Sequence, residues 1–150
     1  MTRIRRPGAL PLSASVEDYL KAIYTLAGAR GEAATNDIAE RLDLAPASVT
    51  EMVRRLADHG YLAYKRYRGV RLTATGRSAA LRTVRRHRVI ETYLSQALGY
   101  DFDSVHDEAE RLEHAASDDL INRMASAVGE PEVDPHGSPI PTQSQISRQR

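Results

Sequence analysis

Residues 45–73, APASVTEMVRRLADHGYLAYKRYRGVRLT, decide the fold, because the spacing of their apolar side chains changes along the stretch. In the first half, the four apolar residues from Val49 to Leu56 recur at helical spacing, and Pro46 suits a first helical position. In the second half, YLAYKR and GVRLT alternate on either side of a Tyr67-Arg68-Gly69 turn. The stretch therefore predicts a helix followed by a β-hairpin.

Two further helices are expected before this stretch. Residues 16–27 keep a helical spacing of apolar side chains, and Ser13 or Ser15 is expected to cap them. Thr35 is expected to cap a short helix over residues 36–44. Three helices, the last two joined by a tight turn, and then a hairpin are the order of a winged helix-turn-helix. We therefore predict a winged helix-turn-helix DNA-binding domain over residues 13–74.

Helical spacing also dominates the sequence after the hairpin. A long helix is expected over about 75–98, a second over 105–116 and a third over 118–128. The serines that precede the two shorter helices are the expected caps: Ser104 and Ser117. These helices predict an all-helical second domain over residues 75–128, so the fold as a whole is expected to be mostly α.

The two ends of the chain have a different composition. Residues 1–12 carry three arginines and two prolines and are typical of a flexible basic arm. Residues 129–150 carry four prolines and few apolar side chains, which favours a linker or disordered tail. Cysteine is absent, which excludes a disulfide scaffold, a thiolate zinc site, an iron–sulfur cluster and a cysteine nucleophile. No apolar run approaches the roughly 18 residues that span a bilayer, so we expect a cytoplasmic protein without a membrane partner.

Charge is unevenly distributed along the chain. The formal net charge is +1, yet residues 54–88 contain eleven lysines and arginines against one acid. Residues 100–120 contain eight acids against one arginine. A dense basic segment attracts polyanions, of which a phosphate backbone is the commonest. A dense acidic segment with histidines attracts cations.

The helix that begins at Pro46 has the features of a DNA-reading helix. Its apolar stripe would face the core, which leaves small and hydroxylated side chains on the exposed amino-terminal half. Such side chains let a helix enter the major groove and contact base edges. The expected base-contacting residues are Ala47, Ser48, Thr50 and Glu51. The expected phosphate-contacting residues are Arg54, Arg55, Arg66 and Arg68.

The acidic segment contains a pattern that is typical of metal ligands. His106, Glu110, Glu113 and His114 fall at i, i+4, i+7 and i+8, which places them on one face of a continuous helix. The preceding helix carries a second i, i+4 pair, His87 and Glu91. Asp18, beside the apolar stripe of the first helix, is a further candidate. Nitrogen and oxygen donors without sulfur suit Mn²⁺, Fe²⁺, Co²⁺ or Zn²⁺.

Four segments together resemble the diphtheria toxin repressor family, and within it the manganese transport regulator branch. The segments are SVEDYLKAIYTL, DIAERLDLAPASVTEMVRRL, YLAYKRYRGVRLTATG and VHDEAERLEH. The resemblance implies a homodimeric transcriptional repressor, not an enzyme, with a metal-binding and dimerisation domain after its DNA-binding domain. It also implies activation by a divalent cation and binding to palindromic operators of metal-uptake genes.

The resemblance assigns the candidate ligands to two sites. It implies a primary site at Asp18, Glu110, Glu113 and His114 and an ancillary site at His87, Glu91 and His106. Asp18 and Glu110 stand where iron-type members place softer ligands, and hard oxygen donors favour Mn²⁺. Lys21 stands where manganese-type members place a second carboxylate, and a lysine cation cannot act as that ligand. Residues 134–141, DPHGSPIP, resemble the linker to an SH3-like third domain, so we expect an ancillary site without ligands from such a domain.

Alternatives remain open at this point. An iron-responsive regulator of the same family would use Fe²⁺ in place of Mn²⁺, and Co²⁺, Zn²⁺ or Cd²⁺ is expected to substitute in vitro. A winged-helix regulator gated by a small organic ligand is a more remote alternative. Histidines and carboxylates also build metal-dependent hydrolases, but the basic winged unit would then have no role.

Overall fold

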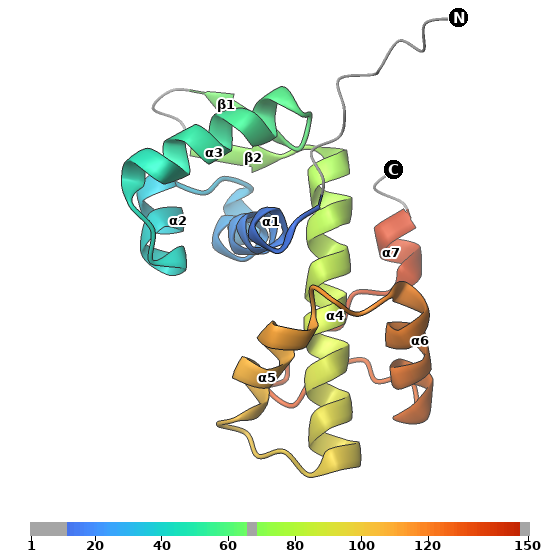
Figure 1. The fold of residues 1–150 in the computed structure, drawn as a ribbon. Helices are drawn as coiled ribbons and strands as arrows, with labels where there is room; N and C mark the ends of the chain where they lie inside the picture. The colour runs from blue at the N-terminus through green and yellow to red at the C-terminus, as the bar shows by residue number, and fades with distance from the viewer. Residues whose placement is uncertain (1–11, 66–68, 148–150) are drawn as a thin grey trace, which may run out of the picture. The chain divides into compact units, whose positions relative to one another are not determined.

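The computed structural model describes residues 12–65 and 69–147. These residues form two compact units, the first extending to Ala80 and the second from Leu81 to Ser147. The structure confirms a mostly helical fold with one two-stranded sheet (Figure 1). Among the described residues, no helix combines the length and the apolar character that crossing a membrane requires.

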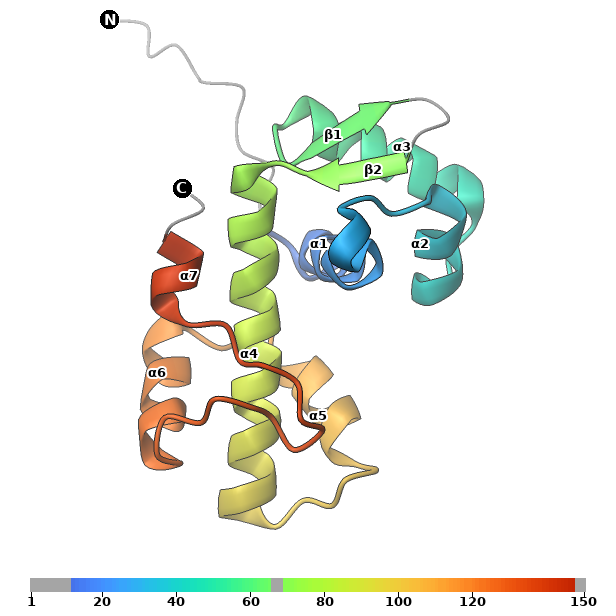
Figure 2. The ribbon, with the colours of Figure 1, turned by 180° about the vertical axis from the view of Figure 1, so that it is seen from behind.

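The first unit has the predicted winged helix-turn-helix order. Its helices are α1 (Ala14–Ala27), the 3-10 turn η1 (Gly28–Arg30), α2 (Thr35–Leu42) and α3 (Pro46–Asp58). The strands β1 (Leu62–Lys65) and β2 (Gly69–Leu72) pair antiparallel, with Leu62 opposite Leu72 (Figure 2). The helix α4 (Ala74–Leu98) begins in this unit and continues into the second.

Local signals explain where several of these elements begin and end. The Ser13 side chain accepts a hydrogen bond from Val16 N at 3.2 Å, as a helix cap does. Pro46 opens α3 as predicted, and Gly60 follows its last residues with a φ of 85°. The prediction for Thr35 is wrong: Ala34 occupies the cap position without a side-chain bond, and Thr35 is already helical.

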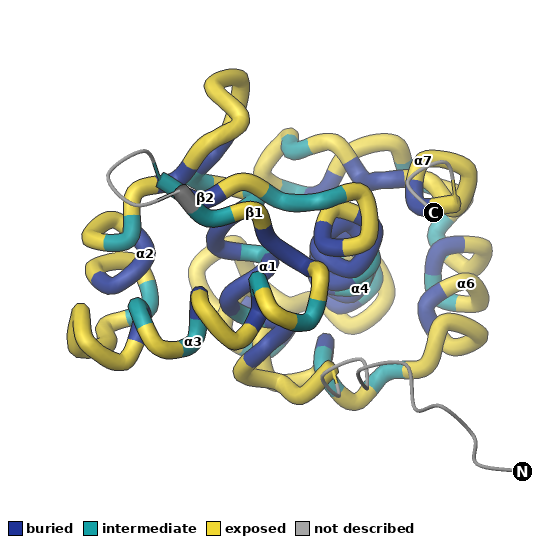
Figure 3. Tube along the Cα trace, turned by 90° about the horizontal axis from the view of Figure 1, so that it is seen from above, coloured by how far each residue is buried: buried dark blue, intermediate teal, exposed yellow. Residues whose placement is uncertain are grey.

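The core of the first unit is aliphatic. Figure 3 colours the trace of buried residues dark blue. The buried residues of this core come from α1, α2, α3 and β2, among other segments, and include Leu20, Ile23, Ile38, Val49, Val53, Leu56 and Val70. A close backbone approach joins the hairpin to α4, because a Cβ at Gly76 would lie only 2.0 Å from the Tyr61 carbonyl oxygen. Thr73 Oγ1 caps α4 at this point by accepting from Gly76 N at 3.1 Å. The wing is therefore fixed to the start of α4 by backbone contacts that only glycine permits.

The second unit packs three shorter helices beside the remainder of α4. They are α5 (Val105–Leu112), α6 (Asp118–Ala127) and α7 (Gln143–Ser147). Its apolar core includes Val89, Ile90, Leu94, Val105, Ala109, Ile121, Ala125 and Ile140. Ser117 caps α6 as predicted, accepting from Leu120 N at 3.1 Å.

Three features of the second unit differ from the predictions. Ser104 precedes α5 without capping it; its hydroxyl instead donates to Asp101 Oδ1 at 2.7 Å. The helix α5 ends at Leu112 rather than at 116. Residues 129–147 differ from the predicted linker or disordered tail, because Ile140 and Ile146 are buried and α7 lies within them. The other predicted terminal segment, the basic arm at 1–12, lies almost wholly outside the described residues.

Candidate metal centre and nucleic-acid interface

The exposed face of α3 presents most of the predicted DNA-contacting side chains. Ala47, Ser48, Glu51, Arg54 and Arg55 are exposed. Thr50 is half-buried, and its hydroxyl donates to the Pro46 carbonyl oxygen at 3.1 Å. Its hydroxyl is therefore engaged by the helix backbone, whereas the small side chains of Ala47 and Ser48 are exposed. Arg66 and Arg68 lie outside the described residues.

In the second unit, α4 places His87 and Glu91 one helical turn apart in a buried position. Their side chains are 10% and 2% exposed, and His87 Nε2 contacts Glu91 Oε1. Burial raises the pKa of Glu91, but hydrogen bonds from His87 and His106 and the charges of His87 and His136 outweigh it and lower the pKa to about 2. The Glu91 carboxylate is therefore a buried anion at neutral pH.

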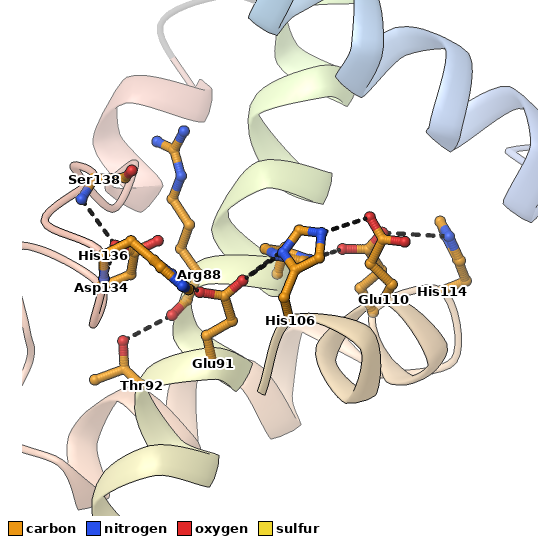
Figure 4. A network of polar contacts seen from close by, with 11 residues as sticks. Arg88, Glu91, Thr92, His106, Glu110, His114, Asp134, His136 and Ser138 are labelled. Carbon is orange, nitrogen blue, oxygen red and sulfur yellow. Dashed lines mark hydrogen bonds and ion pairs between the residues drawn. The ribbon is translucent and has the colours of Figure 1, made fainter. Parts of the chain in front are cut away.

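The next helix, α5, brings a second His–Glu pair to this position. His106 Nδ1 lies 3.1 Å from Glu91 Oε1 and 3.1 Å from His87 Nε2. His106 Nε2 lies 3.2 Å from Glu110 Oε1, and both of these side chains are about half exposed. The predicted i, i+4 pairs of the two helices thus meet, one pair buried and one facing solvent (Figure 4).

Glu113 and His114 extend the same cluster beyond the end of α5. Glu113 is fully buried, and its Oε2 lies 2.7 Å from His87 Nδ1. His114 Nε2 lies 3.4 Å from Glu113 Oε1. Because α5 ends at Leu112, His114 stands in the following turn and not on a continuous helical face. Residues that the sequence assigned to two sites, His87 to one and Glu113 to the other, are in direct contact.

Asp18 belongs to the first unit. It lies on α1, half-buried, between the buried residues Glu17 and Tyr19. Its assignment to the primary site is based on its position in the sequence.

Two residues of the cluster were missed by the sequence analysis. His136 Nδ1 lies 2.8 Å from Glu91 Oε2, on the side of Glu91 away from His106 (Figure 4). Asp134 is buried, and its Oδ1 accepts from His136 N at 2.9 Å and from Ser138 N at 2.8 Å. Both residues lie in the segment that was interpreted as a linker. The only signal in the sequence was an acid and a histidine two positions apart between prolines.

The donor atoms of the cluster fit a divalent cation. Two ligand atoms at right angles, each about 2.1 Å from a shared ion, lie about 3.0 Å apart. The N···O distances from His87 Nδ1 to Glu113, from His106 Nδ1 to Glu91 and from His106 Nε2 to Glu110 are 2.7, 3.1 and 3.2 Å. The two His106 contacts use opposite ring nitrogens, so they belong to different ions or only one of them is replaced by a cation. Ligand atoms of His87, His106 and Glu110 all lie within 4.8 Å of one another. All donors are imidazole nitrogens or carboxylate oxygens, as Mn²⁺, Fe²⁺ and Zn²⁺ accept.

Comparison with protein families matches both parts of the chain to one kind of protein. Residues 11–70 match the family model described as the iron dependent repressor, N-terminal DNA binding domain. Residues 73–142 match the model described as the iron dependent repressor, metal binding and dimerisation domain.

Curated relatives are similar over most of the chain. The HTH-type transcriptional regulator MntR of Lysinibacillus sphaericus (strain C3-41) is 40% identical over 121 residues, which cover 81% of this chain and 86% of the relative. The MntR of Bacillus subtilis (strain 168) is 40% identical over 114 residues, 76% of this chain and 80% of the relative.

Solved structures have the same fold. A manganese-dependent transcriptional repressor in complex with manganese matches with a TM-score of 0.80 at 45% identity, covering 86% of this chain and 59% of that chain. ScaR with bound Zn²⁺ matches with a TM-score of 0.75 at 35% identity, covering 85% of this chain and 60% of that chain. The chain thus spans about three fifths of the length of these two structures.

Proposed function

The chain belongs to the iron-dependent repressor family, and we propose that it is a manganese-responsive transcriptional repressor that binds its operator when it holds a divalent cation. The observation that carries the proposal is the pairing, in one chain, of an exposed small-residue face on α3 with a partly buried histidine–carboxylate cluster. The curated relatives are transcriptional regulators, which favours this function over a metal-dependent hydrolase. Since its partner is promoter DNA, the protein acts in the cytoplasm.

The cation-binding residues form two sites in this proposal. The primary site consists of Asp18, Glu110, Glu113 and His114, and the ancillary site of His87, Glu91 and His106. Burial of Glu113 and Glu91 supports both, because a buried carboxylate needs a positive partner. A bound cation supplies positive charge to these acids and links side chains from different helices. The oxygen-rich primary set suits Mn²⁺, with Fe²⁺ as the alternative and Co²⁺, Zn²⁺ or Cd²⁺ as substitutes in vitro.

DNA recognition is assigned to the winged unit. Ala47, Ser48, Thr50 and Glu51 on α3 would contact base edges, and Arg54, Arg55, Arg66 and Arg68 would contact phosphates. The second unit matches a dimerisation domain, and a two-fold dimer presents two copies of α3. Such a dimer suits a palindromic operator whose half-sites lie about one helical turn, or roughly 34 Å, apart. Metal-uptake genes are the expected targets.

Cation binding would control DNA binding through the distribution of the ligands. Asp18 lies in the first unit, whereas Glu113 and His114 lie in the second. Residues that share one ion must converge, so a saturated site selects the arrangement of the two units in which they do. A shift from 1:99 to 99:1 in favour of that arrangement requires about 10⁴-fold tighter cation binding by it. By linkage, operator DNA tightens cation binding by the same factor by which the cation tightens DNA binding.

The test measures operator binding as a function of the metal. A duplex is first selected from a random-sequence pool in the presence of Mn²⁺, and its binding is then followed by fluorescence anisotropy with Mn²⁺, Fe²⁺, Co²⁺, Zn²⁺ or chelator. We expect binding with Mn²⁺ and a loss of at least about 10-fold in affinity with chelator. Tight, sequence-selective binding by the chelated protein would contradict the proposal, and a preference for Fe²⁺ would favour the iron-responsive alternative.

Matched variants separate the cation-binding residues from the DNA-binding residues. Asp18→Ala and Glu110→Ala should weaken Mn²⁺-dependent operator binding, because each removes a cation ligand. Ser48→Ala and Arg54→Ala should weaken operator binding while the Mn²⁺ affinity of the DNA-free protein stays unchanged. If all four variants altered Mn²⁺ affinity alike, the assignment of these residues to separate cation-binding and DNA-binding roles would be wrong. A small organic ligand as the effector would leave operator binding insensitive to the chelator.

A further inference from the structure

We propose that Arg71 of the wing contacts a DNA phosphate, and that Glu32 positions its guanidinium for this contact. The inference rests on the proposed function, because the partner of Arg71 is the operator DNA. Arg71 lies on β2, and Glu32 lies in the segment that joins η1 to α2. Neither residue belongs to the DNA-contacting set assigned above to α3 and to the turn of the hairpin.

The backbone brings the two residues together. Ala33 forms an isolated antiparallel bridge with Val70: Ala33 N donates to the Val70 carbonyl oxygen at 2.9 Å, and Val70 N donates to the Ala33 carbonyl oxygen at 2.8 Å. The strand β2 is therefore hydrogen-bonded on both sides, to β1 and to the segment before α2 (Figure 2). Gly69 permits this approach with a φ of 89°, since a Cβ there would lie 3.0 Å from the Ala33 carbonyl oxygen.

The outer face of the hairpin carries the Arg71 side chain. Val70 before it is buried and Leu72 after it is half-buried, as alternation along a strand requires. Arg71 and its cross-strand neighbour Ala63 are exposed. Because the alanine side chain is a single methyl group, it leaves the arginine accessible, and the Arg71 side chain is 58% exposed.

Glu32 engages one nitrogen of the guanidinium. Arg71 Nε donates to Glu32 Oε1 at 2.9 Å, and the Glu32 side chain is 43% exposed. Within the part of the chain that the structure describes, neither Nη group of Arg71 makes a hydrogen bond. A guanidinium has five N–H donors in a rigid plane, so the four on the Nη groups stay available. Parallel N–H groups of this plane match two oxygens of a phosphate.

The effect of Glu32 is on the orientation of Arg71 and not on the attachment of the wing. An ion pair in which both side chains are this exposed contributes little to stability. The bridge between Ala33 and Val70, both of which are buried, already holds the segment against β2. A carboxylate bound to Nε restricts rotation of the guanidinium plane, so less freedom is lost when a phosphate binds the Nη groups.

The position of Arg71 in the sequence also suits a phosphate contact. It belongs to the basic segment 54–88, and such a segment attracts a phosphate backbone. Arg68, a proposed phosphate-contacting residue, stands three positions earlier, and three residues span at most about 11 Å. Arg71 can therefore reach the same stretch of DNA backbone as Arg68, which would extend the phosphate contacts of the wing onto β2.

The first experiment measures how operator affinity depends on salt. Fluorescence anisotropy with the selected duplex follows the full-length protein at saturating Mn²⁺ over about 50–200 mM salt. Arg71→Gln should lower the steepness of log K against log salt concentration by about 0.9, the value of one phosphate contact. It should weaken binding to the operator and to a random duplex by the same factor, because phosphate contacts carry no sequence information. An unchanged slope would overturn the phosphate contact.

Arg123→Gln is the matched control. Arg123 also donates its Nε to one carboxylate oxygen, Asp119 Oδ2 at 3.0 Å, and it is exposed, but it lies on α6 in the second unit. Its salt slope should equal that of the wild type. If both variants lowered the slope equally, loss of any exposed arginine would have this effect, and the assignment to Arg71 would be wrong.

Two substitutions of Glu32 test its positioning role. Glu32→Gln and Glu32→Ala both remove the charge, but only glutamine keeps an oxygen that accepts from Arg71 Nε. The alanine variant should bind the operator about 2- to 5-fold more weakly than the glutamine variant, the equivalent of one exposed hydrogen bond. In an Arg71→Gln background the two should bind alike, because Glu32 acts through Arg71. Equal affinity of the two Glu32 variants with Arg71 present would overturn the positioning role.

The wild-type protein separates failure of this inference from failure of the proposed function. Circular dichroism confirms that each variant is folded, and equilibrium dialysis should show unchanged Mn²⁺ binding, since none of the substituted residues is a proposed cation ligand. If the wild type shows no Mn²⁺-dependent operator binding, the proposed function fails. If the wild type binds and Arg71→Gln keeps its salt slope, only the contact inferred here is overturned.

Discussion

The two units of this chain bury charged and polar side chains to different extents. The core of the winged unit is apolar, with Leu20, Val53 and Leu56 completely buried, and its buried charged and polar residues are Glu17 and Ser78. The second unit adds buried charged and polar residues to its own aliphatic core: Thr83, Arg85, His87, Glu91, Thr92, Glu113 and Asp134. Apolar burial stabilises a fold under almost any solution condition, whereas a buried carboxylate stabilises it only when positive charge compensates it. The first unit is therefore stabilised mainly by apolar burial, whereas the stability of the second also depends on positive charge near its buried carboxylates.

The difference has a consequence for stability. Removing an aliphatic side chain from the first unit leaves an apolar cavity, which a hydrated metal cation does not fill, so we expect its cost to be independent of metal. The buried acids of the second unit contact neighbouring histidines, and a bound cation would add positive charge beside them. Stability of the second unit should therefore depend on Mn²⁺, and the following predictions test this contrast.

The largest effect is expected from Leu56→Ala in α3. This side chain is fully buried in the core of the winged unit, and such a truncation costs about 2–5 kcal/mol of unfolding free energy. Urea denaturation, with hydrogen exchange to assign the loss to the first unit, measures it. The cost should be the same with Mn²⁺ and with chelator. If Mn²⁺ abolished this cost, the stability of the winged unit would depend on the cation, and the contrast between the two units would be wrong.

Mn²⁺ itself should produce the next largest effect. At a free concentration 100 times its Kd, a cation that binds only the folded protein adds about 2.7 kcal/mol of stability. Glu113→Gln, which keeps the size of the side chain but removes its charge, should lose most of this gain. Thermal unfolding of both proteins with Mn²⁺ and with chelator provides the measurement. Equal stabilisation of the wild type and the variant would exclude Glu113 as a ligand.

The fold could be predicted from the sequence to the extent that neighbouring residues determine it. The apolar spacing from Val49 to Leu56 and the proline at 46 are local signals, and α3 follows them. Ser117 caps its helix as predicted, and of the two candidates for the first helix, Ser13 or Ser15, Ser13 is the cap. The prediction that a serine caps the helix after it failed at Ser104, because another residue binds that side chain. Asp101 accepts from Ser104 N at 2.8 Å and from its hydroxyl, so that serine side chain is engaged before α5 begins.

The i, i+4 pairs of the candidate site could be predicted from the sequence, but the contacts between distant segments could not. The i, i+4 spacing identified His87 with Glu91 and His106 with Glu110, because both members of each pair lie on one helix. The contact of His136 with Glu91 joins residues 45 positions apart. It depends on the course of the segment that follows α6. Hydrogen bonds from Arg85 and Arg88 of α4 to carbonyl oxygens of this segment, and the buried side chain of Ile140, determine that course. No periodicity in the sequence reports such a contact.

A smaller effect is expected at the start of α6. Ser117→Ala removes the hydroxyl that accepts from Leu120 N and should cost about 1 kcal/mol of unfolding free energy. Ser104→Ala is the comparison, because Ser104 precedes α5 without capping it and its hydroxyl donates to Asp101 instead. Urea denaturation in the presence of chelator compares the two. If Ser117→Ala lost no stability, the hydrogen bond from Leu120 N to the Ser117 hydroxyl would not stabilise α6.

The smallest effect is expected at Asp118, which links α6 to α4. Its Oδ1 accepts from Arg86 at 3.0 Å and its Oδ2 from Arg82 at 2.8 Å. Burial raises the pKa of this carboxyl, but the hydrogen bonds and charges of the two arginines outweigh it, so the pKa lies below the usual 3.8. A carboxyl whose pKa is lowered by folding stabilises the protein above its unfolded pKa, and this contribution is lost as the pH falls through the folded pKa.

Asp118→Asn should therefore destabilise the protein at pH 7 and converge with the wild type as the pH falls below 3.8. The Asp118 side chain is about half exposed, so water and salt screen the pairs and reduce the expected cost to about 0.2–1 kcal/mol. Asp119→Asn is the control: it shares the first turn of α6, but its partner Arg123 is 78% exposed, as is Asp119 itself. Urea midpoints across pH 3–7 compare the two variants. Equal losses would mean that both acids act only on the helix end, and that the arginines of α4 do not hold α6 through Asp118.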